Sequence, residues 1–282
     1  MEIRRARHAG ACYGVNRALG MVEQVLHTGA EAHSLGPLIH NPRVVAGLAA
    51  RGVDVVSSVD EVQLGTLVIR SHGVPPQIIA AARAKGLTVL DATCPHVIRA
   101  QQAAQNLRET GFTVLVVGEL GHPEVEGISA YAGPAALVVQ EPSDLPDELS
   151  SQRLGIVVQT TQTPEALAEI VVALKARGLA PEVRNTVCDA TKQRQEAARQ
   201  LAQEVDVMLV VGGRNSGNTT RLAEICATVC DQTHHIEGPD ELQDSWFIDA
   251  KAVGITAGAS TPEDQIIAVE QGLMQLEVFG VR

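Results

Sequence analysis

The sequence has few aromatic residues, no excess of positive charge and no long apolar runs. Its 282 residues include one Trp, two Tyr and three Phe, and the net charge is −11. Nucleic-acid binding usually depends on a basic face and on aromatic side chains that stack with bases, so we expect no nucleic-acid partner. The longest apolar runs are far too short to span a bilayer, so we expect no membrane partner either.

A secretory signal and paired cysteines are also missing. The N-terminal stretch "MEIRRARHAGAC" has no apolar core of the kind that a signal peptide carries. None of the five cysteines belongs to a CxxC pair. We therefore expect a cytoplasmic protein without structural disulfides. Cys226 and Cys230 lie four residues apart in "RLAEICATVC", a spacing that predicts two small buried residues on one apolar helix face.

An internal repeat appears when the other three cysteines, Cys12, Cys94 and Cys188, are used as origins. A helical stretch and then an apolar strand follow each cysteine. The strand leads to a glycine that lies twenty-four residues after the cysteine: Gly36, Gly118 or Gly212. Four residues beyond the glycine the three copies carry His40, His122 and Ser216, and two residues later Pro42, Glu124 and Asn218. Each copy then has a second strand that leads to a proline, in "TLVIRSHGVPP", "LGIVVQTTQTP" and "AVGITAGASTP".

This repeat predicts three related α/β domains with parallel sheets. The expected boundaries are 1–94 with the N-terminal segment, 95–187, and 188–282 with the C-terminal tail. Ligands of such sheets gather beyond the carboxyl ends of the strands. A pseudo-threefold trefoil would bring the three cysteines together and surround them with six loops.

Three cysteines from three units suit a metal site that keeps one position open. Zinc enzymes often use three protein ligands and a water molecule, and a 4Fe–4S cluster held by three cysteines leaves one iron for substrate. Ligation by thiolates alone favours iron–sulfur over zinc, although the sequence does not separate the two. The alternative is three buried structural thiols, and the shared register of the cysteines argues against it.

Polar residues beside the expected helix starts form a second candidate group. Helix N-termini combined with histidine and hydroxyl donors make a pocket for phosphate or diphosphate. Ordinary N-capping is the alternative for the serines and the asparagine, and partial exposure in a loop is the alternative for the histidines. The group consists of His40, His72, Ser216, Asn218 and Ser260.

The stretch "HPEVEG" contains the one carboxylate of this register, Glu124, two residues after His122. Beside a metal centre, Glu124 could donate a proton if its surroundings raised its pKa. It could equally be a favourable acidic residue in the first turn of a helix, which is the role we expect for Glu126. Thr160 and Thr161 could relay a proton or cap the helix that follows them.

Nine segments, in this order, resemble the LytB family of 4-hydroxy-3-methylbut-2-enyl diphosphate reductases, which perform the last step of the methylerythritol phosphate route to isoprenoids. The segments span nearly the whole chain: "GACYGVNRA", "LIHN", "SHGV", "DATCP", "GHPEVEG", "QTT", "RQEA", "NSGNTTRLAE" and "TAGAS". The resemblance implies a trefoil of three α/β domains around a 4Fe–4S cluster, with Cys12, Cys94 and Cys188 as its ligands.

The resemblance also implies a reaction and a set of roles. The substrate's terminal hydroxyl would bind the iron that no cysteine holds, and Glu124, with Thr160 and His122 beside it, would supply protons as the C–O bond breaks. Two electrons and two protons would give water and a mixture of isopentenyl and dimethylallyl diphosphate, with a ferredoxin or flavodoxin as electron donor. The diphosphate would contact residues from all three repeats: His40, His72, His122, Thr160, Ser216, Gly217, Asn218 and Ser260. Gly217 stands where many members have a second serine, so its contact would come from the backbone N–H.

Two other functions fit the same residues. One is a zinc hydrolase with three cysteine ligands that acts on a phosphorylated substrate. The other is a non-catalytic cluster protein that senses oxygen or carries electrons. Metal content and the effect of Glu124→Gln on turnover separate these functions from the reductase.

Overall fold

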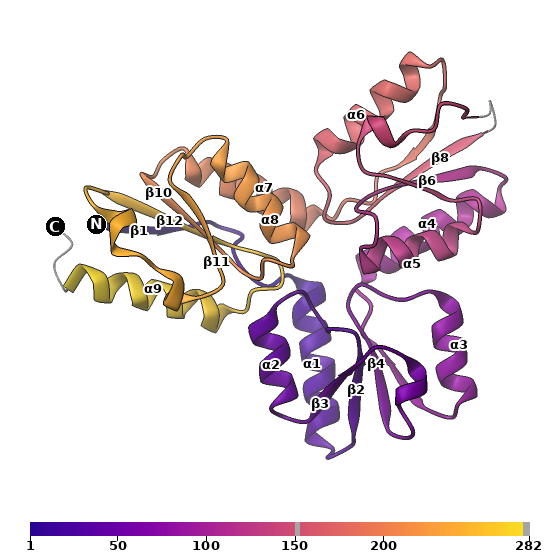
Figure 1. Ribbon diagram of the computed structural model, residues 1–282, viewed down its shortest axis with the longest axis horizontal. Coiled ribbons are helices and arrows are strands. Elements are labelled where there is room, and N and C mark those ends of the chain that lie inside the picture. The colour runs from indigo at the N-terminus through magenta and orange to yellow at the C-terminus, as the bar shows by residue number, and fades with distance from the viewer. Residues whose placement is uncertain (150–152, 279–282) are drawn as a thin grey trace. The chain divides into compact units, whose positions relative to one another are not determined.

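The computed structural model describes residues 1–149 and 153–278, and within them lie three four-stranded parallel sheets (Figure 1). The first sheet has the order β3 (Val53–Val56), β2 (Ala32–Leu35), β4 (Thr66–Ile69), β5 (Thr88–Asp91). The second has the order β7 (Leu137–Val139), β6 (Thr113–Val117), β8 (Leu154–Val158), β9 (Glu182–Arg184). The third has the order β11 (Thr233–Ile236), β10 (Val207–Val211), β12 (Ala252–Ala257), β1 (Glu2–Arg5). The predicted α/β class with parallel sheets is therefore confirmed.

The helices alternate with these strands. They are α1 (Tyr13–His27), α2 (Pro42–Ala49), α3 (Pro76–Ala84), α4 (Pro95–Glu109), α5 (Pro123–Ala132), α6 (Pro164–Ala176), α7 (Asp189–Ala202), α8 (Gly217–Ala227) and α9 (Glu263–Val278). Short 3-10 turns occupy Val59–Glu61, Pro142–Asp144, Pro239–Glu241 and Asp244–Phe247. Among the described residues, no helix is both long enough and apolar enough to cross a membrane.

The chain divides into two compact units. Unit A contains Met1–Asn16, Ile39–Ala46 and the chain from Asp189 onward, and it holds the third sheet. Unit B contains Arg17–Leu38 and Gly47–Cys188, and it holds the first and second sheets. The domain boundaries expected near residues 94 and 187 stay predictions.

The three sheets share one strand order, and the last position of the third sheet is filled from the N-terminus. Strand β1 pairs with β12 in parallel, with Glu2 opposite Ala252 and Arg5 opposite Ile255. The corresponding edge strands β5 and β9 each come from the same stretch of chain as the rest of their sheet. The sequence repeat predicts only two strands in each domain. The outer strands escaped prediction because they are short and partly exposed, as in the fully exposed "EVR" of β9.

Alternate residues of the central strands build two separate cores in the second sheet. Leu115, Val117 and Ile156 face one side, where they pack with Leu167 and Ile170 of α6. Helices α4 and α5 lie on the other side of the sheet from α6 (Figure 1). The intervening residues of the same strands pack with these two helices in a second core, which includes Val114, Val116, Val157, Ala104 and Ile128. Period-two alternation with apolar residues on both faces explains why these strands appear as continuous apolar runs.

The third sheet is covered on both faces in the same way. Helix α9 packs on one face with Ile266, Val269 and Leu273, and helices α7 and α8 cover the other. Cys226 and Cys230 lie in that second core, so their predicted burial is confirmed, but Cys230 follows the end of α8 and the two do not share one helix face. Burial raises the pKa of the Cys226 thiol to about 12, so this side chain is a neutral core residue.

Gly118, one of the three repeat glycines, marks a close approach of chains at the end of β6. A Cβ at this position would lie 2.6 Å from Val125 and 2.9 Å from the side-chain oxygen of Gln159. That oxygen accepts a hydrogen bond from the Glu119 N–H, which holds the loop between β6 and α5 in place. The missing side chain therefore allows α5 to begin directly above the strand ends.

Candidate active site and cysteine loops

Cys12, Cys94 and Cys188 occupy equivalent positions, each beside a different one of the three sheets. Each follows an edge strand, β1, β5 or β9, and each precedes the helix that begins the next repeat, α1, α4 or α7. Each backbone N–H donates to a carbonyl two residues beyond a central strand: Cys12 to Ala259 at 3.0 Å, Cys94 to Ser71 at 2.9 Å, and Cys188 to Thr160 at 3.0 Å. The three loops thus have the same local anchoring, which the sequence register alone only suggested.

These cysteines differ from the other two in their surroundings. The three are partly exposed, whereas Cys226 and Cys230 are buried among apolar side chains. A metal ligand must be a deprotonated thiol that a metal can reach, and the high pKa of Cys226 opposes that form. Each of the three partly exposed thiols is accessible to a soft metal such as iron.

Glu124 is buried in the first turn of α5, with 1% of its surface exposed. One carboxylate oxygen accepts the Thr160 N–H at 2.6 Å, and the other lies 3.0 Å from the Thr160 hydroxyl. The carbonyl of Thr160 accepts the N–H of Cys188. One threonine therefore links the buried acid to the loop that carries a candidate ligand.

The environment of Glu124 raises the pKa of its carboxyl to about 7. Burial is the main cause, because a charged carboxylate loses its hydration there, and the negative charge of Glu119 adds to the effect. The two hydrogen bonds from Thr160 oppose the shift by stabilising the charged form. A carboxyl group with this pKa can hold and release a proton near neutral pH, which suits a general acid.

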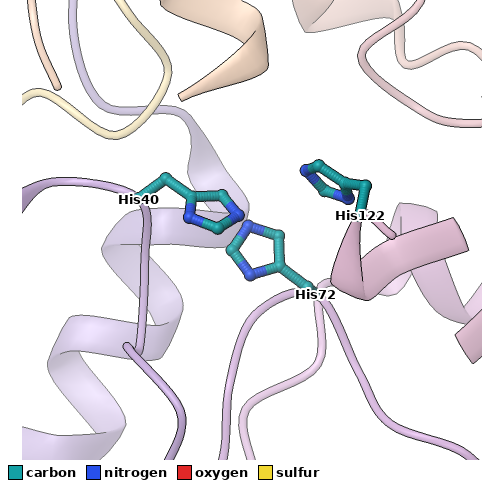
Figure 2. A group of neighbouring side chains, drawn as sticks. All are labelled: His40, His72 and His122. Carbon is teal, nitrogen blue, oxygen red and sulfur yellow. The ribbon is translucent and has the colours of Figure 1, made fainter. Parts of the chain in front are cut away.

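His122 lies next to this acid in unit B, and His72 lies next to His122. The Nδ1 atom of His122 accepts the Glu124 N–H at 3.1 Å, so His122 caps helix α5. Accepting at Nδ1 places the proton of the neutral ring on Nε2. The His72 ring, from the loop after β4, meets the His122 ring edge-on, with 5.5 Å between centroids (Figure 2). His72 and His122, which are 50 positions apart in the sequence, are thus neighbours in the structure.

Unit A gathers the other predicted polar residues around the backbone of His40. The Ser260 hydroxyl donates to the His40 carbonyl at 2.9 Å, and the neighbouring Asn41 amide donates to the Ser260 carbonyl at 2.9 Å. Gly213, in the loop between β10 and α8, lies so close that a Cβ there would be 2.9 Å from the His40 carbonyl oxygen. The loops before α2, α8 and α9 therefore meet at one place within unit A.

Ser216 and Asn218 stand at the start of α8, and Gly217 is its first residue. The Ser216 hydroxyl accepts the Thr219 N–H at 3.4 Å and so caps the helix. Ser216 therefore has the N-capping role that the sequence offered as the alternative to phosphate binding. Asn218 is 5% exposed, and neither its side-chain oxygen nor its nitrogen has a hydrogen-bond partner within the described part of the chain. A buried amide without partners is costly, and a bound polar ligand would satisfy it.

Arg194 is a residue of this region that sequence reasoning missed, although it lies in the quoted segment "RQEA". Its guanidinium is buried, with the residue 4% exposed, and it donates to the Gly10 carbonyl at 2.7 Å and to the Ala190 carbonyl at 3.1 Å. Gly10 is two residues from Cys12, so Arg194 anchors that cysteine loop. The repeat contained a signal for it. The equivalent positions of the other two repeats, six residues after the cysteine, are Ala18 and Ala100, so a long charged side chain at position 194 departs from the pattern.

Known protein sequences match this chain over nearly its whole length. The sequence model of the LytB protein family matches residues 3–274, which is nearly all of the chain. The chain belongs to the LytB family. A relative from Citrifermentans bemidjiense, named 4-hydroxy-3-methylbut-2-enyl diphosphate reductase, is 46% identical over 271 residues, which cover 95% of this chain and 96% of the relative. A relative of the same name from Geobacter metallireducens is 43% identical and covers 98% of both chains.

Solved structures agree with the LytB assignment. A structure described as (E)-4-hydroxy-3-methyl-but-2-enyl diphosphate reductase, the terminal enzyme of the non-mevalonate pathway, matches with a TM-score of 0.73 and 43% identity. The match covers 98% of this chain and all of that one. The E-1-hydroxy-2-methyl-but-2-enyl-4-diphosphate reductase of Plasmodium falciparum matches with a TM-score of 0.90 and 26% identity, covering 98% and 87% of the two chains. The resemblance drawn from nine short segments is therefore confirmed at the level of the LytB family.

Proposed function

We propose that this LytB-family chain is a 4-hydroxy-3-methylbut-2-enyl diphosphate reductase. The observation that carries the proposal is 46% identity, over 95% of the chain, to a protein of that name. The reaction removes the allylic hydroxyl with two electrons and two protons, and it gives water with isopentenyl and dimethylallyl diphosphate. The C–O bond breaks, the electrons enter the allylic fragment, one proton leaves with the oxygen as water and the other adds to carbon.

Cys12, Cys94 and Cys188 are proposed as the ligands of one iron–sulfur cluster of the 4Fe–4S type in each chain. Their matched loops, partial exposure and common backbone anchoring support this choice. When bound, a cluster with three cysteine ligands supplies single electrons and a Lewis-acidic position for the hydroxyl. Arg194 and the three carbonyls that accept the cysteine N–H groups would hold the loops that carry the ligands.

Glu124 is proposed to deliver the proton that accompanies the leaving oxygen. Its burial and its pKa of about 7 allow the carboxyl to stay protonated until the reaction needs the proton. Thr160 would orient the carboxyl through its N–H and hydroxyl, and the same residue reaches the Cys188 loop. His122 would hold the start of α5 and present its Nε2–H to the substrate.

The diphosphate is proposed to bind the histidines and the small polar residues at the helix starts. Hydrogen-bond donors of this kind, together with helix N-termini, bind phosphate oxygens without long flexible cations. The unsatisfied amide of Asn218 is the observation that most directly favours a ligand here. The proposed contacts are His40, His72, His122, Thr160, Ser216, the Gly217 N–H, Asn218 and Ser260.

The proposal extends to the setting of the reaction. A ferredoxin or flavodoxin would deliver electrons one at a time in the cytoplasm. The three α/β domains, with boundaries near residues 94 and 187, would place one cysteine each at the common site. Neither nucleic acid nor a membrane takes part in this reaction.

Anaerobic turnover tests the proposed function. The chain, purified without oxygen and loaded with iron and sulfide, should convert the hydroxylated diphosphate to the two products in the presence of dithionite and a viologen mediator. A colourless protein that contains zinc and releases phosphate would instead show the hydrolase. A brown protein with a full complement of iron that consumes no substrate would show the sensor or electron carrier.

A further inference from the structure

A cavity of about 560 Å³ opens in unit B at the carboxyl ends of the strands of the first sheet. Its wall includes the ends of β2, β3 and β4, the first turns of α3, and Glu126 of α5. Strand β2 is followed in the chain by β3 on one side of it and then by β4 on the other, so the cavity lies where the strand order reverses. Ligands of open parallel sheets bind in this position, and the volume is that of a small-molecule pocket.

Arg70, the residue directly after β4, extends across Gly36 at the end of β2. A Cβ at position 36 would overlap the Arg70 guanidinium, so the glycine leaves the space that this side chain occupies. The Nε atom of Arg70 is buried without a hydrogen-bond acceptor, and no carboxylate within residues 1–149 and 153–278 forms an ion pair with it. Burial lowers the pKa of the guanidinium, and the charge of Glu126 opposes this shift. The desolvation cost of the cation is therefore offset only in part, by the charge of Glu126.

In the other two repeats, uncharged side chains of the protein occupy the space beside the equivalent glycine. In the second repeat Gln159 crosses Gly118, and its oxygen accepts the Glu119 N–H at 2.9 Å. In the third repeat the position is Gly258, which leaves room for Thr219. Among the described residues of the three repeats, the first one places a charged side chain there, Arg70, whose Nε has no acceptor, and the cavity described above opens beside it.

The lining indicates the class of ligand that would fit. Leu35, Val59, Val74 and Ile78 form an apolar wall, and the hydroxyls of Ser57 and Ser58 stand beside it. Arg70 provides one positive charge, whereas Asp60 and Glu126 each provide a negative one. A diphosphate, which carries several negative charges, would be repelled by the two carboxylates. A single carboxylate group can accept two parallel hydrogen bonds from the guanidinium, while the apolar tail of the same molecule packs against the apolar side chains of the cavity.

We propose that this cavity, the Arg70 pocket, is a second ligand site that binds a small monocarboxylate with a short apolar tail. The carboxylate pairs with the Arg70 guanidinium above Gly36, and the tail lies against Leu35, Val59, Val74 and Ile78. The site is separate from the residues proposed for the diphosphate, and no bond changes in it. Glu126, which the proposed reaction does not use, limits the charge that the pocket accepts.

Titration calorimetry with hexanoate tests the Arg70 pocket in the full-length chain, with inorganic diphosphate present in excess to occupy the proposed substrate site. Hexanoate should bind saturably, whereas 1-hexanol and inorganic phosphate should bind at least tenfold more weakly. Arg70→Met should weaken hexanoate binding at least tenfold. Arg83→Met removes an exposed arginine of α3 that does not line the pocket, and it should leave the affinity unchanged.

Glu126→Gln provides the opposite test, because removing this negative charge should tighten hexanoate binding several-fold. Far-UV circular dichroism and thermal unfolding of each variant show whether the fold is retained. Absence of saturable binding to the wild-type chain, or equal affinity in the wild type and a folded Arg70→Met variant, would overturn the proposal. Phosphate binding as tight as that of hexanoate would overturn the proposed ligand class. None of these outcomes depends on iron or on turnover, so they are independent of the reductase activity.

Discussion

At the scale of single residues, Glu124 combines burial with a near-neutral pKa. A glutamate in the first turn of a helix is ordinarily exposed and ionised, yet this one is 1% exposed and is held by both donors of Thr160. The neighbouring Glu126, two positions later, is exposed and lines the Arg70 pocket. Two carboxylates in the same helical turn therefore have different environments, because only one of them faces the interior.

Replacing Glu124 by Gln should lower kcat by about 10²–10⁴, since a general acid contributes a factor of this size. The amide has nearly the same shape as the carboxyl and can keep a hydrogen bond to Thr160, so iron content should match the wild type. Steady-state turnover and iron analysis on the same preparation check this. Glu126→Gln is the matched control and should retain turnover. Full activity in Glu124→Gln would remove Glu124 from the proposed mechanism.

The raised pKa of Glu124 also predicts a pH dependence of stability. Below pH 4.5 the group is protonated in both states, and between pH 4.5 and about 7 only the folded chain keeps the proton. The free energy of unfolding should therefore fall as the pH rises through this window, by about 3 kcal/mol in total, and then stay constant. Urea titrations from pH 5 to 8 measure this contribution as the difference between wild type and Glu124→Gln. Parallel pH profiles for the two chains would contradict it.

Arg194→Met should destabilise the chain by about 1–3 kcal/mol, the cost of leaving a buried polar group without its donor. The Gly10 carbonyl would lose its guanidinium partner, and the Cys12 loop would lose an anchor. Urea unfolding measures the first effect, and iron retained per chain after gel filtration measures the second. Arg199→Met, an exposed change on the same helix, should alter neither quantity. Equal iron retention in both variants would show that Arg194 does not support the loop.

At the scale of elements, the repeating feature is an edge strand, a cysteine and a helix. The cysteine N–H extends the strand pairing by donating to the loop of the adjacent central strand in all three copies. The helix then begins at the residue directly after the cysteine, at Tyr13, Pro95 and Asp189. This construction places a thiol at the carboxyl edge of each sheet, where parallel α/β sheets bind their ligands.

Serine at positions 12, 94 and 188 should each abolish stable iron binding, because a hydroxyl is a poor ligand for iron–sulfur clusters. Cys226→Ala and Cys230→Ala should keep the iron, since those thiols lie in the apolar core of unit A. Iron and sulfide analysis of anaerobically reconstituted variants separates the two groups. Loss of iron in a folded Cys226→Ala or Cys230→Ala variant would overturn the choice of ligands.

At the scale of the whole molecule, the chain starts in the sheet that it also finishes. Strand β1 supplies the outer position beside β12, the position that β5 and β9 hold in the other two sheets. The first five residues therefore belong structurally with the last third of the chain. They also lead into the loop that carries Cys12, so the N-terminal strand connects the third sheet with the first cysteine.

Removing Met1–Arg5 should lower the free energy of unfolding by about 2–4 kcal/mol, because several backbone hydrogen bonds along β12 are lost at about 1 kcal/mol each. The exposed edge of β12 should also promote aggregation. Urea unfolding and light scattering check both effects. As a control, Arg4→Gln keeps the strand backbone and removes only surface ion pairs, so its stability should stay within about 0.5 kcal/mol of the wild type. A truncated chain as stable as the full one would contradict the structural role of β1.

Much of the fold could be predicted because the central strands and the helices leave strong periodic signals. Strands β6, β8, β10 and β12 are apolar on both faces, and their glycine and proline boundaries are visible in the sequence. The outer strands could not be predicted, since three or four partly exposed residues carry little pattern. The pairing of β1 with β12 joins positions about 250 residues apart, and local sequence contains no information about it.

Some residues of the candidate site could likewise be predicted from the sequence, and others could not. The cysteine register singled out Cys12, Cys94, Cys188 and Glu124 as candidates because thiols and a carboxylate stand at matched positions of the repeat. Arg194 and Arg70 were not predicted, because an arginine in a sequence is ordinarily a surface residue, and only the structure shows that Arg194 and the Nε of Arg70 are buried.

The sequence by itself determined the α/β class, the threefold repeat, the candidate ligands and the LytB family, since all of these depend on residue types and their spacing along the chain. The tertiary structure decided which carboxyl of "HPEVEG" is buried, that His122 meets His72, and that Thr160 joins Glu124 to the Cys188 loop. It also decided that Arg194 lies inside the protein. The physical reason is that desolvation, pKa and hydrogen-bond partners depend on which distant segments pack together, and that packing is a property of the folded chain.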